Sequence, residues 1–251
     1  MTTGVRPFVQ HYDRIYGDKD YARDITVFSK LAGLPSISAP SVLEIGPGTG
    51  NHTALLSRMS TSLVSVEIDP DFVEILRSKV ERLGLINAEV ESVTLDRLGD
   101  RKFDAACALF HVLNYIAPSD MPVFVHSLAA LMKPGAWFVA DLWNWEAVTL
   151  DPPRHDVRKK SLADGALTQI IDPSLDRAAA TVRLDYHISI EPSNPPIDFR
   201  ETLDLQMWAR PDLQAIFDKA GFDEISFHAY ADVDQAPDAR SFRQWLRARK
   251  N

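Results

Sequence analysis

Three glycines at alternate positions, Gly46, Gly48 and Gly50, directly follow a short apolar segment, residues 41–45. The β-branched and aliphatic residues of that segment predict a buried strand, and the apolar spacing of residues 54–59 predicts a helix beyond the glycines. Glycine lacks a Cβ and reaches positive φ, so the main chain of this loop can pass close to a ligand at the carboxyl end of the strand. The amides at the start of the helix would point to the same place. This stretch is therefore predicted to bind a small ligand.

An acidic residue, Glu67, stands at the end of a second predicted strand, residues 63–66, about 20 residues beyond the glycine loop. A carboxylate in that position can accept hydrogen bonds from ribose hydroxyls. Asp69 is interpreted differently, as the N-cap of a helix that begins at Pro70. The alternative is that both acids only cap this helix.

Candidate groups for proton transfer follow the fourth predicted strand. Residues 103–110 are almost continuously apolar, as expected for a central parallel strand covered on both faces. His111 and Tyr115 come next, at the same predicted sheet edge as the glycine loop, where open α/β sheets bind ligands. Either side chain could act as a base or orient a substrate. His111 could equally cap a helix or be a hydrogen-bonded core residue.

The spacing of the glycines distinguishes between ligands. A dinucleotide fingerprint has glycine at its first, third and sixth positions, but the sixth position here is Asn51. The pattern from Glu44 to Gly50 is instead Glu-x-Gly-x-Gly-x-Gly, which resembles motif I of the class I S-adenosylmethionine-dependent methyltransferases. Residues 131–136, Leu-Met-Lys-Pro-Gly-Ala, are similar to a later block of the same superfamily. The resemblance covers nearly the whole chain, and its specific motifs lie in the first half.

The resemblance implies S-adenosylmethionine as the cofactor, with the glycine loop under its methionine and ribose end and Glu67 on its ribose. It also implies that Ile68 flanks the adenine. The family usually places an acid beside the adenine amino group after the third strand, where this chain has Ser92 or Val93. Adenine recognition is then expected to rest on main-chain groups, on Glu91 or on a shifted alignment. The predicted cofactor-binding residues are Glu44, Gly46, Gly48, Gly50, Glu67, Ile68, Ser92, Phe110 and Tyr12.

The segment before the first strand contains Tyr12 and Tyr16 in a Tyr-Asp-x-x-Tyr pattern. In the small-molecule branch of the family, notably the enzymes that methylate amino-sugars on nucleotide carriers, a similar segment folds over the cofactor and touches the acceptor. The resemblance therefore implies that both tyrosines belong to a lid; the alternative is that they only anchor an N-terminal helix. In the same enzymes the position that matches Tyr115 can be histidine. The predicted catalytic residues are His111, Tyr115 and Tyr16, with Trp143, Asn144 and His187 as pocket candidates of lower rank.

The order of strand and helix patterns predicts an α/β fold: a seven-stranded, mostly parallel sheet with helices on both faces, which by resemblance is the Rossmann-like methyltransferase fold. Between residues 151 and 208 the apolar period changes to two, which predicts a small antiparallel β cap of about three strands, at 167–171, 181–190 and 199–208, with turns at 172–174 and 192–196. The predicted organisation is a lid and cofactor-binding half at 1–150, the acceptor cap at 151–208, and a helix and two strands completing the same sheet at 209–251.

Length, charge and cysteine content limit the possible functions. With 251 residues, 45% of them hydrophobic, the chain can form one α/β domain with an insertion. No apolar run approaches the roughly 20 residues needed to span a bilayer, and the start of the chain lacks the apolar core of a signal peptide. Together with a single cysteine, Cys107, this predicts a cytoplasmic protein with no membrane partner. The net charge of −8 disfavours nucleic acid, so a small-molecule acceptor and a monomer or homodimer are expected.

Methyl transfer from a sulfonium is an in-line displacement, so the enzyme must hold the donor carbon and the nucleophile at near-attack distance. An amine acceptor needs little beyond deprotonation, whereas a hydroxyl acceptor needs a general base or a metal. No cluster of His, Asp and Glu has metal-ligand spacing, so no metal is predicted. Two alternatives stay open: a nucleotide-binding oxidoreductase of Rossmann type, and a non-catalytic protein that keeps a cofactor site.

Overall fold

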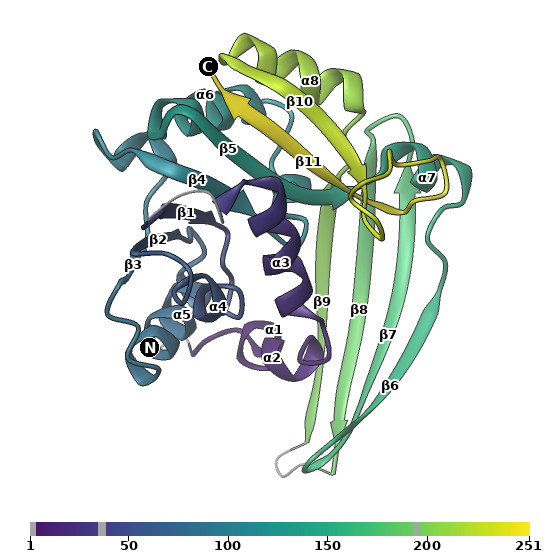
Figure 1. Cartoon of the computed structure of the whole chain (residues 1–251). Coiled ribbons are helices and arrows are strands. Elements are labelled where there is room, and N and C mark those ends of the chain that lie inside the picture. The colour runs from purple at the N-terminus through teal and green to yellow at the C-terminus, as the bar shows by residue number, and fades with distance from the viewer. Residues whose placement is uncertain (1–3, 35–38, 193–195) are drawn as a thin grey trace.

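Two β-sheets organise the protein. The computed structural model describes residues 4–34, 39–192 and 196–251. One sheet has seven strands and carries helices on both faces, and the other has four antiparallel strands and stands beside it (Figure 1). The predicted α/β class with a seven-stranded, mostly parallel sheet is thereby confirmed. Within the described residues, no helix is both long and apolar enough to cross a membrane.

The seven-stranded core sheet has the order β10-β11-β5-β4-β1-β2-β3. Strands β1 to β5 pair in parallel, and β11 runs antiparallel to both β5 and β10. The strand order reverses at β1, which lies between β2 and β4, and open α/β sheets bind ligands at the carboxyl ends of strands at such a point. The strands are β1 (Ser41–Ile45), β2 (Ser62–Val66), β3 (Ala88–Glu91), β4 (Phe103–Ala108), β5 (Met132–Trp143), β10 (Phe222–Ala229) and β11 (Arg243–Lys250).

Helices cover both faces of the core sheet. On one face α6 and α8 complete a hydrophobic cluster, in which the ring of Phe217 stacks on Phe138 of β5. On the other face α3 buries Ile25, Phe28 and Leu31, the residues whose spacing predicts that helix. The helices are α1 (Pro7–Gln10), α2 (Tyr12–Ile15), α3 (Tyr21–Leu31), α4 (Thr53–Leu56), α5 (Pro70–Arg82), α6 (Met121–Leu131), α7 (Trp145–Leu150) and α8 (Arg210–Lys219), with short 3-10 turns η2 (Leu95–Arg97) and η3 (Val112–Tyr115).

Two local features differ from a simple strand-loop-helix order. The helix predicted after the glycines is present but is a single turn, α4, which begins after His52. Residues 133–135, Lys-Pro-Gly, lie inside the bounds of β5, which starts directly after α6. There Gly135 has a φ of +81°, and the pairing of β4 with β5 shifts register between Phe103 and Ala105. The Pro-Gly pair therefore bends the start of a strand instead of separating two elements.

The second sheet contains β6 (Asp156–Leu162), β7 (Gly165–Asp176), β8 (Thr181–Glu191) and β9 (Ile197–Gln206), each antiparallel to the next. The prediction of about three strands is wrong, because β6 was missed. No residue of β6 is buried, so this charged edge strand lacks the apolar alternation by which the others were found. The sheet lies within residues 151–208. Of the turn predicted at 192–196, residues 193–195 lie outside the described residues.

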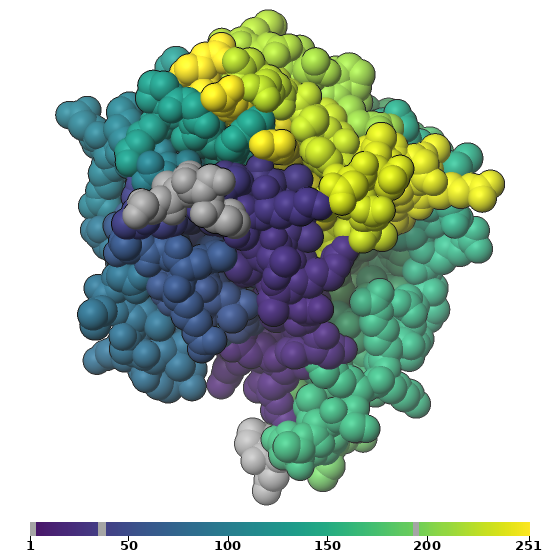
Figure 2. Space-filling model, in the orientation of Figure 1, coloured from purple at the N-terminus to yellow at the C-terminus, as the bar shows by residue number. Residues whose placement is uncertain are grey.

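The N-terminal segment lies between the two sheets. In Figure 2 the purple N-terminal helices fill the space between the blue part of the core and the green second sheet. Phe8, Val9 and Ile15 belong to the same hydrophobic cluster as Val182 and Ile188 of the second sheet. The N-terminal segment, which contains α1 and α2, therefore packs against both the second sheet and α5 of the core.

Candidate functional site

The loop after β1 is shaped by its three glycines. Gly46, Gly48 and Gly50 have φ values of +64°, +58° and +86°, a region that L side chains rarely adopt. A Cβ on Gly46 would lie 2.7 Å from Val112 Cγ2, and one on Gly50 would lie 2.5 Å from Leu76 Cδ1. A Cβ on Gly48 would meet only the Phe72 ring, at 3.8 Å. Gly46 and Gly50 thus allow the loop to pack against η3 and α5, and Gly48 leaves room on the side where a ligand can approach.

Glu44 lies beneath this loop. It is 2% exposed, and its Oε2 accepts hydrogen bonds from Thr53 Oγ1 and Ser65 Oγ, both at 2.7 Å. Burial raises the pKa of Glu44 to about 7, although the two hydroxyls oppose the rise. Glu44 therefore ties β1 to α4 and β2, and it can support a cofactor through the position of the loop.

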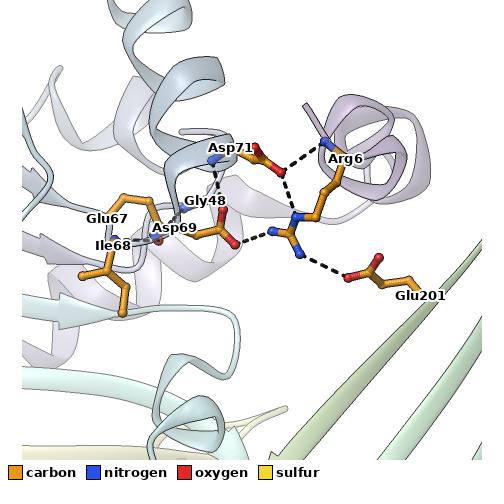
Figure 3. Close-up of polar contacts among 7 residues, drawn as sticks. All are labelled: Arg6, Gly48, Glu67, Ile68, Asp69, Asp71 and Glu201. Carbon is orange, nitrogen blue, oxygen red and sulfur yellow. Dashed lines mark hydrogen bonds and ion pairs between the residues drawn. The ribbon is translucent and has the colours of Figure 1, made fainter. Parts of the chain in front are cut away.

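Glu67 is held at the carboxyl end of β2 by three main-chain amides (Figure 3). Its Oε2 accepts from the N–H of Gly48 at 3.0 Å, and its Oε1 accepts from Ile68 at 2.9 Å and Asp69 at 3.0 Å. Burial raises the pKa of this carboxyl, and the amides oppose the rise. Each carboxylate oxygen keeps further lone pairs, so the group can still accept hydrogen bonds from a diol. The arrangement fits a ribose beside the glycine loop.

The place expected for adenine lacks an acid among the described residues. Ile68 is 70% exposed, and Ser92 is exposed directly after β3. The neighbouring Glu91 accepts a 3.0 Å hydrogen bond from Arg101 Nη2, so its carboxylate is already paired. Ile68 and Ser92 therefore offer an apolar surface and a hydroxyl next to Glu67.

Arg6 connects three acids around the start of α5 (Figure 3). Asp69 caps α5 as predicted, since its Oδ1 accepts from the N–H of Asp71 at 3.0 Å. The Arg6 guanidinium pairs with Asp69, with Asp71 Oδ2 at 2.8 Å and with Glu201 Oε1 of β9 at 3.4 Å. No motif marks Arg6, because its partners lie far along the chain. This ion cluster joins the N-terminal segment to both sheets.

Tyr12 and Tyr16 lie in an aromatic cluster beside the glycine loop. Their ring centroids are 4.7 Å apart, Tyr12 is 5.3 Å from Phe72, and Tyr16 is 5.2 Å from Phe110. Burial raises the pKa of both tyrosines well above the ordinary value, so both hydroxyls are protonated at neutral pH. Tyr16 and Tyr186 of β8 each affect the pKa of the other, so their hydroxyls lie near one another. Tyr186 was not predicted. The only feature of the sequence that could have indicated it is the alternation of β8, in which Tyr186 shares the buried face with the apolar residues.

Tyr115, at the end of η3, approaches the same hydroxyls. Its side chain is 53% exposed, yet desolvation is the main cause that raises the pKa of its hydroxyl, with Tyr186 and Glu201 as further causes. Tyr115 also lines a cavity of about 550 Å³ together with Thr181 and Gln206. We call Tyr12, Tyr16, Tyr115 and Tyr186 the tyrosine cluster.

His111 follows β4 and faces a buried acid. Its Nδ1 lies 3.1 Å from Oδ2 of Asp141, at the end of β5. Burial lowers the pKa of His111 and Asp141 opposes this, so the ring is neutral at pH 7. Burial alone would raise the pKa of Asp141, but His111 and Arg243 together lower it far below the usual range. The structure thus places an imidazole of lowered pKa beside a carboxylate of lowered pKa that also pairs with Arg243.

The three pocket candidates of lower rank, Trp143, Asn144 and His187, have different surroundings in the structure. The centroid of the Trp143 ring lies 6.0 Å from that of the His111 ring, so Trp143 stays a candidate for the pocket. Asn144 caps α7 and donates to the carbonyls of Asp238 and Ser241, so its side chain is used to hold a loop. His187 pairs with Asp198 on the face of β8 that points away from the hydrophobic cluster, outside the candidate site.

Lys19 is a site residue that no pattern predicted. Its Nζ pairs with the fully buried Asp24 and lies 4.9 Å from the Phe110 ring. Burial lowers the pKa of Lys19 to about 8. A cation at this edge can attract the carboxylate of a ligand that resembles an amino acid.

Comparison with known proteins connects the first half of the chain with methyltransferases. Residues 42–135 match the family described as "Methyltransferase domain". A dTDP-3-amino-3,4,6-trideoxy-alpha-D-glucopyranose N,N-dimethyltransferase of Streptomyces venezuelae is 24% identical over 84% of this chain and 87% of its own length. These matches favour the methyltransferase interpretation over a Rossmann oxidoreductase.

Two solved structures share the whole architecture. An S-adenosylmethionine-dependent methyltransferase from Clostridium acetobutylicum has a TM-score of 0.81 at 15% identity and covers 97% of this chain and 98% of its own. The sugar N-methyltransferase KedS8 from a Streptoalloteichus species has a TM-score of 0.78 at 21% identity and covers 96% and 92%. At these identities the likeness concerns the fold. Together with the methyltransferase domain matched at residues 42–135, this fold makes the chain similar to the class I S-adenosylmethionine-dependent methyltransferases.

Proposed function

We propose that S-adenosylmethionine lies on the edge of the core sheet, with Gly46, Gly48 and Gly50 under its methionine and ribose end and Glu67 on its ribose hydroxyls. The carboxylate of Glu67, held by three amides next to the glycine loop, supports this assignment. Ile68 and Ser92 would flank the adenine. Glu44 would act indirectly, by holding the loop.

We propose further that the acceptor is the amine of a small molecule of amino-sugar type, bound at the tyrosine cluster. The main support for this proposal is that the four tyrosines lie close together beside the glycine loop, although they come from three separate segments: the N-terminal segment, η3 and β8. Protonated hydroxyls can hydrogen-bond a polyol, and aromatic faces attract an ammonium group. The relative from Streptomyces venezuelae is named for an amino-sugar, which agrees with this choice.

The cofactor supplies a methyl group activated by a sulfonium, and the residues of the chain supply the rest. Tyr16 and Tyr115 orient the acceptor through their hydroxyls. Phe110 and Tyr12 exclude water from the reacting atoms. Neutral His111 accepts the proton that the nitrogen releases.

In this proposal the second sheet, within residues 151–208, is the acceptor cap, and the N-terminal segment is a lid. The enzyme would act in the cytoplasm as a monomer or homodimer without nucleic acid. The net charge of −8 supports the absence of nucleic acid, and the single, buried Cys107 agrees with a reducing cytoplasm.

The test is release of S-adenosylhomocysteine with matched acceptors. The panel contains dTDP-3-amino-3,4,6-trideoxy-α-D-glucopyranose, the same amino-sugar without its nucleotide, and the analogue with hydroxyl in place of the amine. Turnover of an amine, with mass spectrometry locating the new methyl on nitrogen, supports the proposal. Turnover of the hydroxyl analogue alone overturns the amine assignment. Cofactor binding without any turnover would favour the non-catalytic alternative.

A further inference from the structure

The chain between β4 and η3 has an unusual backbone. Phe110 and His111 are consecutive non-glycine residues with φ values of +70° and +66°. Such conformations are strained for L residues and persist only where the surroundings impose them. A neighbouring group must therefore stabilise the backbone of Phe110 and His111 in this conformation.

Asp141 is such a group. The carboxylate accepts a hydrogen bond from the N–H of Phe110 and lies 3.1 Å from Nδ1 of His111, so it contacts both residues of the turn. It is fully buried at the end of β5, where Arg243 Nη2 of β11 donates to it at 2.8 Å. A buried carboxylate is unfavourable unless it is paired. Asp141 is paired with Arg243, and its other neighbours are the two residues of the turn, Phe110 and His111.

The charged groups around His111 come from three elements. Asp141 of β5 favours a proton on the ring, whereas Arg243 of β11 and Lys19 before α3 oppose it. Asp141 Oδ2 lies 3.1 Å from Nδ1, although the N–H does not align with it as in a regular hydrogen bond. A charged carboxylate at this distance favours the hydrogen on Nδ1, because a carboxylate can only accept. The lone pair then lies on Nε2. Among the described residues, no hydrogen-bond partner of that atom was found.

We infer that Asp141 is a positioning residue for His111: it fixes the ring orientation and the Nδ1–H tautomer, so that Nε2 can take the proton of the acceptor. The inference rests on the proposed function. The acceptor nitrogen forms a bond to the methyl carbon while the carbon–sulfur bond breaks with its electron pair going to sulfur. The resulting ammonium gives one proton to Nε2, and Asp141 stabilises the imidazolium through Nδ1–H.

The first experiment is a mutant cycle on turnover of the amine acceptor. We expect Asp141→Asn and His111→Gln each to lower kcat by about 10- to 100-fold, with little change in cofactor affinity measured by calorimetry. The double variant should be no slower than the slower single variant, because both remove one function. Asp198→Asn is the matched control, since Asp198 contacts His187 at 2.9 Å on the outer face of the second sheet. Losses that multiply in the double variant would overturn the inference.

The second readout is the pH dependence of kcat/KM. Asp141 raises the proton affinity of His111, so removing its charge should move the acid limb of the profile to lower pH in Asp141→Asn. A merely structural role would lower the rate without moving the limb. An unmoved limb therefore contradicts the inference.

The third readout needs no turnover and uses the unmodified protein. Nitrogen-15 NMR should find His111 as the Nδ1–H tautomer, with its signals assigned by their loss in His111→Gln. The opposite tautomer overturns the inference even if Asp141→Asn fails to fold. If the wild-type protein methylates no amine, the proposed function fails, and the tautomer still decides whether Asp141 sets the ring.

Discussion

The two sides of the proposed site are built in different ways. On the cofactor side, contacts come from glycines and main-chain amides within residues 41–69, one continuous β-loop-β stretch. On the acceptor side, contacts come from side chains of the N-terminal segment, η3 and β8, which meet only after the second sheet has packed. The cofactor side therefore depends on local backbone geometry, whereas the acceptor side depends on packing between distant segments.

The strongest test of this contrast is Gly48→Val. The φ of +58° and the approach of a ligand both exclude a β-branched side chain, so cofactor affinity should fall at least about 100-fold, or roughly 3 kcal/mol. Gly84→Val is the matched control, because Gly84 has a φ of +61° and open space around its Cβ. Calorimetry should find near-normal affinity in the control. Equal losses in both variants would mean that strain, and not ligand contact, explains the effect.

A smaller loss is expected from Glu67→Ala. Removing a carboxylate that accepts three amide hydrogen bonds and would bind ribose should weaken cofactor binding by about 1–3 kcal/mol. Calorimetry measures the loss, and Glu67→Gln should recover part of it by restoring one acceptor oxygen. Unchanged affinity in the alanine variant would remove Glu67 from the cofactor site.

Tyr16→Phe tests the acceptor side. The ring contacts with Tyr12 and Phe110 remain, so cofactor affinity should be spared while kcat falls about 10-fold, near 1.4 kcal/mol. Tyr186→Phe removes the partner hydroxyl and should have a smaller effect on kcat. If Tyr16→Phe instead raised the dissociation constant of the cofactor and left kcat alone, Tyr16 would belong to the cofactor side.

The smallest effect concerns the connection between the two sides. Arg6→Ala breaks exposed ion pairs with Asp69, Asp71 and Glu201, each worth about 0–1 kcal/mol, so cofactor affinity should change only a few-fold. Hydrogen exchange of residues 8–21 should nevertheless increase, and S-adenosylhomocysteine should restore protection if the segment is a lid. Arg158→Ala, which breaks only a pair with Asp156 on β6, is the control. Equal protection with and without ligand would make the segment a fixed scaffold.

The same contrast explains what the sequence could predict. The positive φ values of the loop glycines and the capping role of Asp69 could be predicted because both are local backbone features. Glu67 could be placed at the end of its strand, but its hydrogen bond from Gly48 spans 19 positions and left no pattern. His111 and Tyr115 were predicted from their place after a buried strand, which holds for any parallel sheet.

Most of the residues that the sequence did not predict lie on the acceptor side or contact residues there. Asp141, Tyr186 and Arg6 make contacts 30 or more positions away along the chain, and sequence spacing carries no record of such contacts. Strand β6 was missed for another reason. Its exposed, charged residues carry no apolar period, although pairing with β7 fixes its conformation.

Glu44 has a thermodynamic consequence of its own. With a pKa of about 7 in the folded protein against an ordinary 4.5, the folded state holds more protons than the unfolded chain between these values, so stability should fall as pH rises through this interval. A cationic cofactor above the loop should lower that pKa and release a fraction of a proton. The apparent enthalpy of cofactor binding near pH 7 should then depend on the ionisation enthalpy of the buffer. Glu44→Gln should abolish that dependence, so the acid beneath the loop would couple cofactor binding to proton release.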